Sequence, residues 1–201
     1  MTYSQAFIDK HREFNVDYDW WDCVYADFAT ICDILGIELA DHEPRFSGFW
    51  SQGDGASWAG SYNACKLVDK YTRLEPTYDL APQKIREHAP KDTTLHSIAD
   101  QLCLLARIYE PVCADIGRRH GRSYVHENTM TLSEWVYWNG KEVDDVDEEI
   151  QEHIEHTLME QFRALAGWLY STLEKEYDYL TSDEAVIEAL EANEIEEEIA
   201  A

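Results

Sequence analysis

The feature that most constrains the fold is an apolar repeat in the last third of the chain. Apolar residues recur there every three or four positions over about eight helical turns. They are Ile150, Ile154, Leu158, Phe162, Leu165, Leu169, Leu173 and Tyr177. Since an α-helix has 3.6 residues per turn, this spacing places them along one stripe. We therefore predict one long C-terminal helix whose apolar stripe the rest of the chain must cover.

Four further helices are predicted from periodicity and from start and stop signals. They are expected at residues 17–35, 83–88 and 93–111 and from the Thr181 capping box onward. Gly36 favours the end of the first helix, and Pro82 and Pro90 confine the second to a short segment. Thr181 is followed three positions later by Glu184, which is the spacing of a capping box.

Two segments between the helices have the pattern of β-hairpins. The first, Arg45–Lys66, contains aromatic and small-residue runs on either side of the turn Gly53-Asp54-Gly55. The second, residues 118–143, contains strand formers such as Tyr124 and Val125 together with turn residues. Both hairpins are expected to supply strands to one antiparallel sheet.

These elements predict an α+β fold. An antiparallel sheet of about four strands, arranged as two hairpins, is expected to pack against helices that include one long acidic C-terminal helix. We expect residues 1–180 to form a single α+β domain and residues 181–201 to form a short acidic helix or tail.

The charge is large and unevenly distributed. The chain has 41 Asp or Glu against 16 Lys or Arg, a net charge of −25. Residues 142–201 contain 20 acids against Arg163 and Lys175, so this segment has a net charge of −18. Such a charge repels nucleic acid and membrane surfaces and attracts basic protein surfaces. We therefore expect a basic or nucleic-acid-binding protein as the partner, with no direct binding to nucleic acid or membrane.

Other composition features predict a cytoplasmic protein without a cofactor. No run of about eighteen apolar residues indicates a membrane span, and the charged N-terminus does not resemble a signal peptide. The five cysteines are scattered and include no C-x-x-C pair, so we interpret them as small core residues rather than as a disulfide framework or a zinc site.

The long helix provides the first candidate site. We predict that a partner binds Asp145, Glu148, Glu149, Glu152 and Glu155, which lie on or near the face opposite the apolar stripe. Acids three or four positions apart on a helix are about 5–6 Å from one another, which is comparable to the spacing of phosphates in DNA. The alternative is that these acids are simply a solvated helix face.

The first hairpin turn provides the second candidate site. Gln52 and Asp54, together with His120 and His126 from the second hairpin, are candidates for binding a small ligand. His120, Arg122, Tyr124 and His126 would share one face of a strand if the alternation holds. The alternative is that Asp54 caps its own turn. The two histidines give too few ligands for a metal site, so no metal is predicted.

Three stretches resemble a family found in phages and bacterial genomes. FSGFWSQGDGASWAGSY, at residues 46–62, is similar to the family pattern F-S-G-F-x-S-Q-G-D-G-A. HGRSYVHENTM and YDYLTSDEAVIEALEANE are similar to two further parts of the family, so the resemblance covers about residues 46–194. The family is often labelled an antitoxin of a toxin–antitoxin stability system. The resemblance implies a mobile-genetic-element setting and an α+β fold, and it transfers no catalytic residues.

Three functions remain open on this basis. The first is a phage or mobile-element protein that inhibits a nucleic-acid-binding host defence protein by DNA mimicry. The second is an antitoxin that neutralises a basic toxin. The third is a small-ligand-binding protein or hydrolase that uses the Gly-Asp-Gly loop, although no defined catalytic geometry accompanies that loop. The sequence also leaves open a homodimer.

Overall fold

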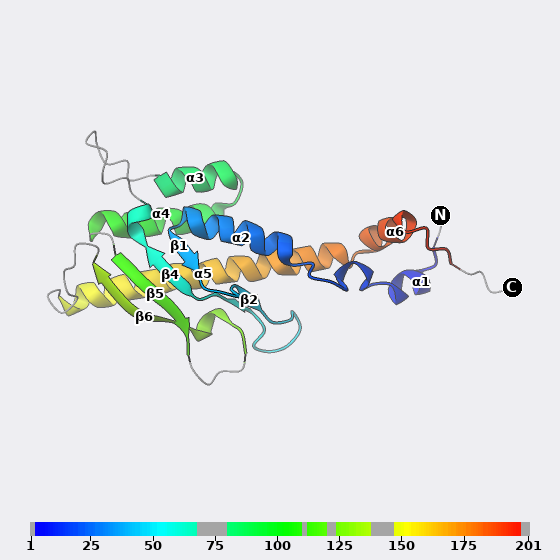
Figure 1. Cartoon of the computed structure of the whole chain (residues 1–201), viewed down its shortest axis with the longest axis horizontal. Coiled ribbons are helices and arrows are strands. Elements are labelled where there is room, and N and C mark those ends of the chain that lie inside the picture. The colour runs from blue at the N-terminus through cyan, green and yellow to red at the C-terminus, as the bar shows by residue number, and fades with distance from the viewer. Residues whose placement is uncertain (1–2, 68–79, 110–111, 120–123, 138–146, 198–201) are drawn as a thin grey trace. The chain divides into compact units, whose positions relative to one another are not determined.

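The computed structural model describes residues 3–67, 80–109, 112–119, 124–137 and 147–197. It confirms the predicted α+β class, because antiparallel sheets are combined with helices (Figure 1). The chain divides into two compact units. The larger unit comprises residues 27–170, and the smaller unit comprises residues 1–26 and 171–201.

The larger unit contains a four-stranded antiparallel sheet. Its strands lie in the order β1 (Ile37–Leu39), β4 (Gly60–Asn63), β5 (Val112–Arg118) and β6 (Met130–Tyr137). A separate two-stranded sheet pairs β2 (Arg45–Phe46) with β3 (Ala56–Ser57). On β5, Val112, Ala114 and Ile116 are buried whereas Asp115 is exposed, which is the alternation expected when one face of a sheet is covered.

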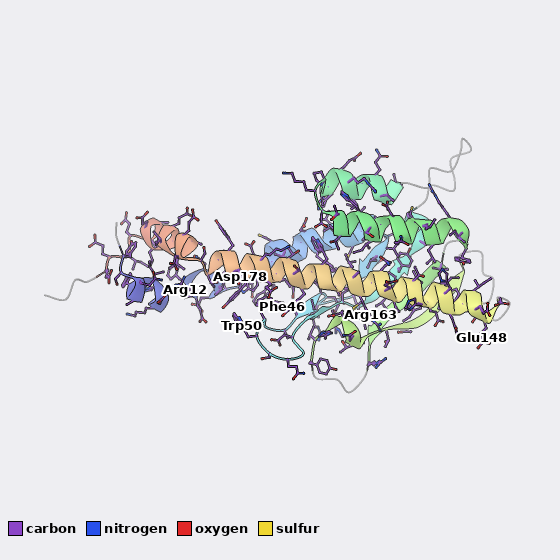
Figure 2. All side chains as sticks on the ribbon, turned by 180° about the vertical axis from the view of Figure 1, so that it is seen from behind. Arg12, Phe46, Trp50, Glu148, Arg163 and Asp178 are labelled. Atoms are coloured by element: carbon purple, nitrogen blue, oxygen red, sulfur yellow. The ribbon has the colours of Figure 1, made fainter. Side chains whose placement is uncertain are left out.

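Helices cover the inner face of this sheet. They are α2 (Asp22–Ile34), which begins in the smaller unit, α4 (Thr93–Ile108) and the part of α5 (Glu148–Leu180) up to Tyr170. α3 (Leu80–His88) packs on α4, to which an ion pair of 2.7 Å between Arg86 and Asp100 joins it. The two opposite views agree that α5 runs along one face of the sheet (Figures 1 and 2). The predicted repeat is confirmed: Ile154, Leu158, Phe162, Leu165, Leu169 and Leu173 are all fully buried.

Phe162 is the central contact between α5 and the sheet side. Its ring lies 5.3 Å from the ring of Trp58 and 5.1 Å from that of Tyr62, in edge-to-face geometry at both contacts. The indole Nε1 of Trp58 also donates a hydrogen bond of 3.2 Å to the carbonyl oxygen of Phe162. Because all three side chains are almost completely buried, each contributes a large apolar area to the core.

A buried ion pair joins the small sheet to the large one. The Glu43 side chain is only 4% exposed and pairs with the guanidinium of Arg118 on β5. Arg118 Nε also donates to the hydroxyl of Ser57 on β3 at 2.8 Å. The second Glu43 oxygen lies 3.3 Å from Arg45 Nε on β2. A buried carboxylate needs such partners, so this network fixes the position of the β2–β3 hairpin.

The smaller unit is built from both ends of the chain. It contains α1 (Gln5–Lys10), a 3-10 turn (Phe14–Val16) and the whole of α6 (Asp183–Ala192). The last turns of α5, from Ser171 to Leu180, also belong to it. Ile8, Val186 and Leu190 form one buried apolar cluster in it. The Asn15 side chain donates to the carbonyl oxygens of Leu180 and Ala185, at 3.0 and 3.1 Å. These two bonds hold the end of α5 and the start of α6 against the N-terminal segment.

The two predicted hairpins differ from the observed strands. The strand before β6 is Val112–Arg118, and the prediction that Tyr124 and His126 lie in a strand is wrong, because they lie between β5 and the 3-10 turn at Glu127–Thr129. In the first segment, β2 and β3 have only two residues each. β4 pairs with β1 and β5 instead, so this part of the large sheet is assembled from strands that are distant in sequence.

The start of α6 also differs from the prediction by one residue. Ser182 is the N-cap, and its hydroxyl accepts from the Ala185 N–H at 3.3 Å. The hydroxyl of Thr181 instead donates to the Tyr177 carbonyl at 2.8 Å. Glu184 is therefore in the second helical position, one residue short of the capping-box geometry.

Replacing Phe162 with Ala should lower the free energy of unfolding by about 3–5 kcal/mol, because it leaves a cavity between Trp58 and Tyr62. Urea denaturation followed by circular dichroism measures this change. Ile108→Ala is the matched control, since Ile108 is 60% exposed on α4 and its loss should cost no more than about 0.5 kcal/mol. Equal effects of the two substitutions would show that this contact is not central.

Candidate functional site

The first turns of α5 present an acidic surface. Glu148, Glu149 and Glu152 are exposed, and these three residues are called the acidic row below (Glu148 is labelled in Figure 2). Asp147 precedes them, and its carboxylate accepts from the Glu149 N–H at 3.0 Å. Asp145, also predicted for this surface, lies outside the described residues.

No Lys or Arg follows along the chain to balance the acidic row until Arg163. The Arg163 guanidinium is about three helical turns away and donates to the Met130 carbonyl at 3.2 Å (Figure 2). Its Nε is buried and has no hydrogen-bond partner among the described residues. Arg163 therefore belongs to the packing between α5 and the start of β6 and leaves the acidic row uncompensated on its own helix.

Part of the acidic row has a stabilising role within the helix. Glu148 and Glu149 lie in the first turn of α5, where the positive end of the helix dipole favours a negative charge. This favourable interaction amounts to about 0.3–1 kcal/mol for each residue at low ionic strength. Glu152 lies beyond the first turn, so the dipole explains less of its presence.

Glu155 has a different role from the acidic row. Its carboxylate accepts a hydrogen bond of 2.8 Å from the indole Nε1 of Trp135 on β6. Trp135 is 7% exposed, so its N–H needs a partner within the protein. The sequence prediction placed Glu155 in the partner surface, whereas the structure also gives it a contact that attaches α5 to the sheet.

Replacing Glu155 with Ala should lower the free energy of unfolding by about 1–2 kcal/mol, because the buried Trp135 N–H loses this acceptor. Glu155→Gln retains an oxygen at the same position and should cost less than about 0.5 kcal/mol. Urea denaturation of both variants measures the difference. Two equal losses would mean that the carboxylate charge, rather than the hydrogen bond, is what matters.

Asp54 organises the loop in which it lies. Its Oδ2 accepts from the backbone N–H of Trp50 at 3.1 Å and of Ser51 at 2.6 Å. Gly53 has a φ of 97°, a left-handed conformation that favours glycine. These bonds give the Asp54 carboxylate the turn-capping role that was the alternative to ligand binding.

The loop that contains Asp54 packs against the segment that contains His126. A side chain added at Gly55 would approach His126 atoms to 3.0–3.2 Å, so the two backbones meet closely at this point. Ser47 links them further, since its hydroxyl donates to the Val125 carbonyl at 3.2 Å. His126 Nδ1 accepts from the Asn128 N–H at 3.1 Å and so caps the following 3-10 turn.

The structure thus brings three of the four predicted ligand-loop residues onto adjacent segments. Gln52 is exposed, while Asp54 and His126 are each engaged with backbone N–H groups. His120 lies outside the described residues. Because the side chains of Asp54 and His126 already hold backbone N–H groups, this arrangement favours a structural role for both.

Replacing Asp54 with Ala should lower the free energy of unfolding by about 1 kcal/mol, because two loop N–H groups lose their acceptor. Asp54→Asn keeps an acceptor oxygen and should retain most of that stability. Chemical denaturation measures both effects. An unchanged stability in Asp54→Ala would contradict the capping role and return Asp54 to the candidate ligand residues.

The outer face of the sheet carries acids that the sequence did not indicate. Glu38 on β1 lies opposite Ser61 on β4, and Ser61 lies opposite Asp115 on β5. Glu38 and Asp115 are exposed and line a shallow depression of about 380 Å³. The backbone position of Glu134 on β6 is next to Asp115 in the same row. The apolar residues Val112, Ala114 and Ile116 alternate with polar or small ones, which is the sequence signal of a strand with Asp115 on its outer face. The sequence analysis assigned no strand to this segment, so these acids were missed.

The described residues offer no metal site and no membrane-spanning helix. No group of three or more His, Cys, Asp or Glu side chains in them is arranged to hold a metal ion. Among these same residues, no helix combines the length and apolar character that crossing a membrane requires. Cys32 and Cys103 are buried as predicted, and burial raises the pKa of the Cys32 thiol. Cys23 is exposed, so its prediction as a core residue is wrong.

Comparison with known proteins identifies the family. A family model described as a domain of unknown function (DUF8835) matches residues 20–183. The match covers most of the chain, so the chain belongs to this family. Comparisons with curated proteins and with solved structures give no match.

Proposed function

We propose that this member of the DUF8835 family binds a basic, nucleic-acid-binding protein and blocks its nucleic-acid site. The observation that carries the proposal is the acidic row at the start of α5, which is exposed and lies in a stretch, residues 142–162, that contains no Lys or Arg. A surface of this kind attracts the basic grooves with which such proteins hold phosphates.

The geometry of the acidic row suits competition with nucleic acid. Neighbouring acids one turn apart are separated by about 4.5–6 Å along the helix axis. One DNA strand presents a phosphate every 3.4 Å along its axis. The two charge densities agree within about a factor of two, and the helix keeps the three side-chain positions within about 100° of its circumference, on one side of α5.

The outer sheet face supports the proposal from a second location in the larger unit. Glu38 and Asp115 are exposed two strands apart, which corresponds to about 10 Å. Small side chains such as Ser61 lie between them, so a partner surface can approach the sheet closely. A basic partner therefore has more than one acidic surface available on this unit.

The resemblance of residues 46–62 to a phage and bacterial family suggests the biological setting. A host defence protein that handles nucleic acid would be the partner in that setting. An antitoxin that neutralises a basic toxin would use the same attraction, with a partner that need not bind nucleic acid. The identity of the captured partner distinguishes these two functions.

The proposal is tested by capturing partners from a host lysate and then competing them with duplex DNA. A captured nucleic-acid-binding protein should be released by DNA and by raised salt, because both act on the phosphate-binding surface. Changing the acidic row to Lys, as Glu148→Lys, Glu149→Lys and Glu152→Lys together, should weaken this binding at least tenfold.

A control variant separates the acidic row from total charge. Glu184→Lys, Glu188→Lys and Glu191→Lys together change the net charge by the same amount on exposed positions of α6. This control should bind nearly as well as the unmodified protein. The proposal fails if the acidic-row variant still binds, or if the partner binds DNA and this protein at the same time. A small basic protein that DNA does not displace would instead indicate an antitoxin.

A further inference from the structure

Two histidines lie within the acidic surface of α5. His153 and His156 are exposed, and in the sequence of residues 142–162 no other side chain can become positively charged. They follow the acidic row from the end of α5 at which Glu148 is labelled in Figure 2. Histidine is the side chain whose charge changes between about pH 8 and pH 5. These two positions therefore decide how much positive charge this part of the helix carries.

The spacing along the helix interleaves the histidines with acids. His153 is four residues after Glu149. His156 is four residues after Glu152 and four residues before Glu160. Side chains four positions apart on a helix are about 5–6 Å from one another. At 3.6 residues per turn, both imidazoles lie within about 40° of Glu149 around the helix. A basic segment that contacts the acidic row therefore also meets the two histidines.

The buried residues of α5 place the two histidines on its solvent side. Ile154 and Leu158 are fully buried. Around the helix, His156 lies about 160° from both of them, and His153 lies about 100–140° away. Neither imidazole belongs to the core, and both are exposed, so each can exchange a proton with water.

Neighbouring elements bring further ionisable groups to this part of α5. The Tyr109 ring, at the C-cap of α4, lies 5.7 Å from the His153 ring in edge-to-face geometry. Near Tyr109 in the sequence are Arg107 and Glu110, of which Glu110 lies outside the described residues. β6, which packs against the same part of α5, contributes Glu134. Tyrosine, arginine and glutamate side chains ordinarily keep one charge state between about pH 8 and pH 5.5. A change of charge on this surface over that range therefore comes from the histidines.

From this arrangement we propose that His153 and His156 make the acidic row a pH-dependent docking surface, which binds a basic partner more weakly when the two imidazoles are protonated. With both imidazoles neutral, the three acids of the row carry a charge of −3, and two bound protons leave −1 on the same side of the helix. The effect follows from Coulomb attraction, which falls with the net charge that the partner meets. The inference rests on the proposed function, because it concerns the regulation of the same surface.

The first test measures the affinity of the full chain for a lysine peptide. N-acetylated (Lys-Gly)5, whose charge is the same at about pH 8 and about pH 5.5, is titrated by isothermal calorimetry at both pH values and equal ionic strength. The unmodified chain should bind it about three- to tenfold more weakly at the lower pH, because two nearby positive charges oppose binding. His153→Gln together with His156→Gln should bind like the unmodified chain at about pH 8 and should lose most of this weakening.

A control variant separates these two histidines from the others. The chain has eight His, and each reduces the negative charge of the chain when it binds a proton. His42→Asn together with His88→Gln removes two other exposed histidines of the larger unit, neither of which lies on α5. Asparagine suits position 42, where φ is 62°. This variant should keep the pH dependence of the unmodified chain, and both variants should melt within a few degrees of it.

A second readout locates the effect on the protein. The imidazole proton signals that are lost in each single variant identify His153 and His156 in a proton NMR spectrum. Binding and protonation are reciprocal, since a bound cation opposes a proton by the same free energy by which the proton opposes the cation. Bound (Lys-Gly)5 should therefore move the titration midpoints of these two signals to lower pH. The signals of His42 and His88 should titrate at nearly the same pH with and without peptide.

The outcomes separate this inference from the proposed function. An equal loss of affinity at the lower pH with and without the two histidines, or midpoints that do not move, would overturn the inference and leave the proposed function standing. If the acidic-row variant binds (Lys-Gly)5 as tightly as the unmodified chain at about pH 8, the row does not attract a basic surface, and both fail. A pH dependence that disappears with these two histidines and persists in the control variant supports the inference.

Discussion

The ring of Phe162 touches Trp58 and Tyr62 at the same time, and the Trp58 indole also bonds to the Phe162 backbone. Because α5 is held against the inner face of the sheet at this point, its first turns are fixed with their acids outward. The Tyr62 hydroxyl is buried without a hydrogen-bond partner among the described residues, and burial raises its pKa well above the usual value. Tyr62 therefore stays neutral and acts as a packing residue. The position of the acidic surface thus depends on an aromatic contact and on the hydrogen bond that accompanies it.

The acids of the larger unit fall into two groups when their partners are considered. Glu43, Asp54 and Glu155 each accept from a guanidinium, a backbone N–H or an indole N–H, so local structure accounts for them. Glu152 and Glu38 are exposed, and no comparable contact is observed for them within the described residues. A net charge far from zero destabilises a compact state through self-repulsion. The acids in the second group are consequently the ones for which partner binding offers a physical reason.

The sequence predicted those features whose signal lies within one element. The α5 repeat extends over the buried span from Ile154 to Leu173, so it identified the helix, and the charge excess identified its acidic character. The strand Val112–Arg118 was missed because it is short, follows directly after a predicted helix, and contains residues that suit either element. The pairing of Glu155 with Trp135 spans two elements and has no local signature. Contacts of that kind arise only from the tertiary arrangement.

Charge density differs between the two units. Because of this difference, salt is expected to act in opposite directions on the stability of the smaller unit and on partner binding. Residues 1–26 and 171–201 contain 16 acids against 3 Lys or Arg, a net charge of −13, whereas residues 27–170 contain 25 against 13, a net charge of −12. The smaller unit carries its −13 on 57 residues and the larger unit its −12 on 144, so repulsion weighs more heavily in the smaller unit. Salt screens charges beyond about 10 Å at 0.1 M. Added salt therefore stabilises the smaller unit while it weakens the attraction between the acidic row and a basic partner. If added salt weakens partner binding while it stabilises the smaller unit, the loss of binding comes from the contact surface and not from unfolding.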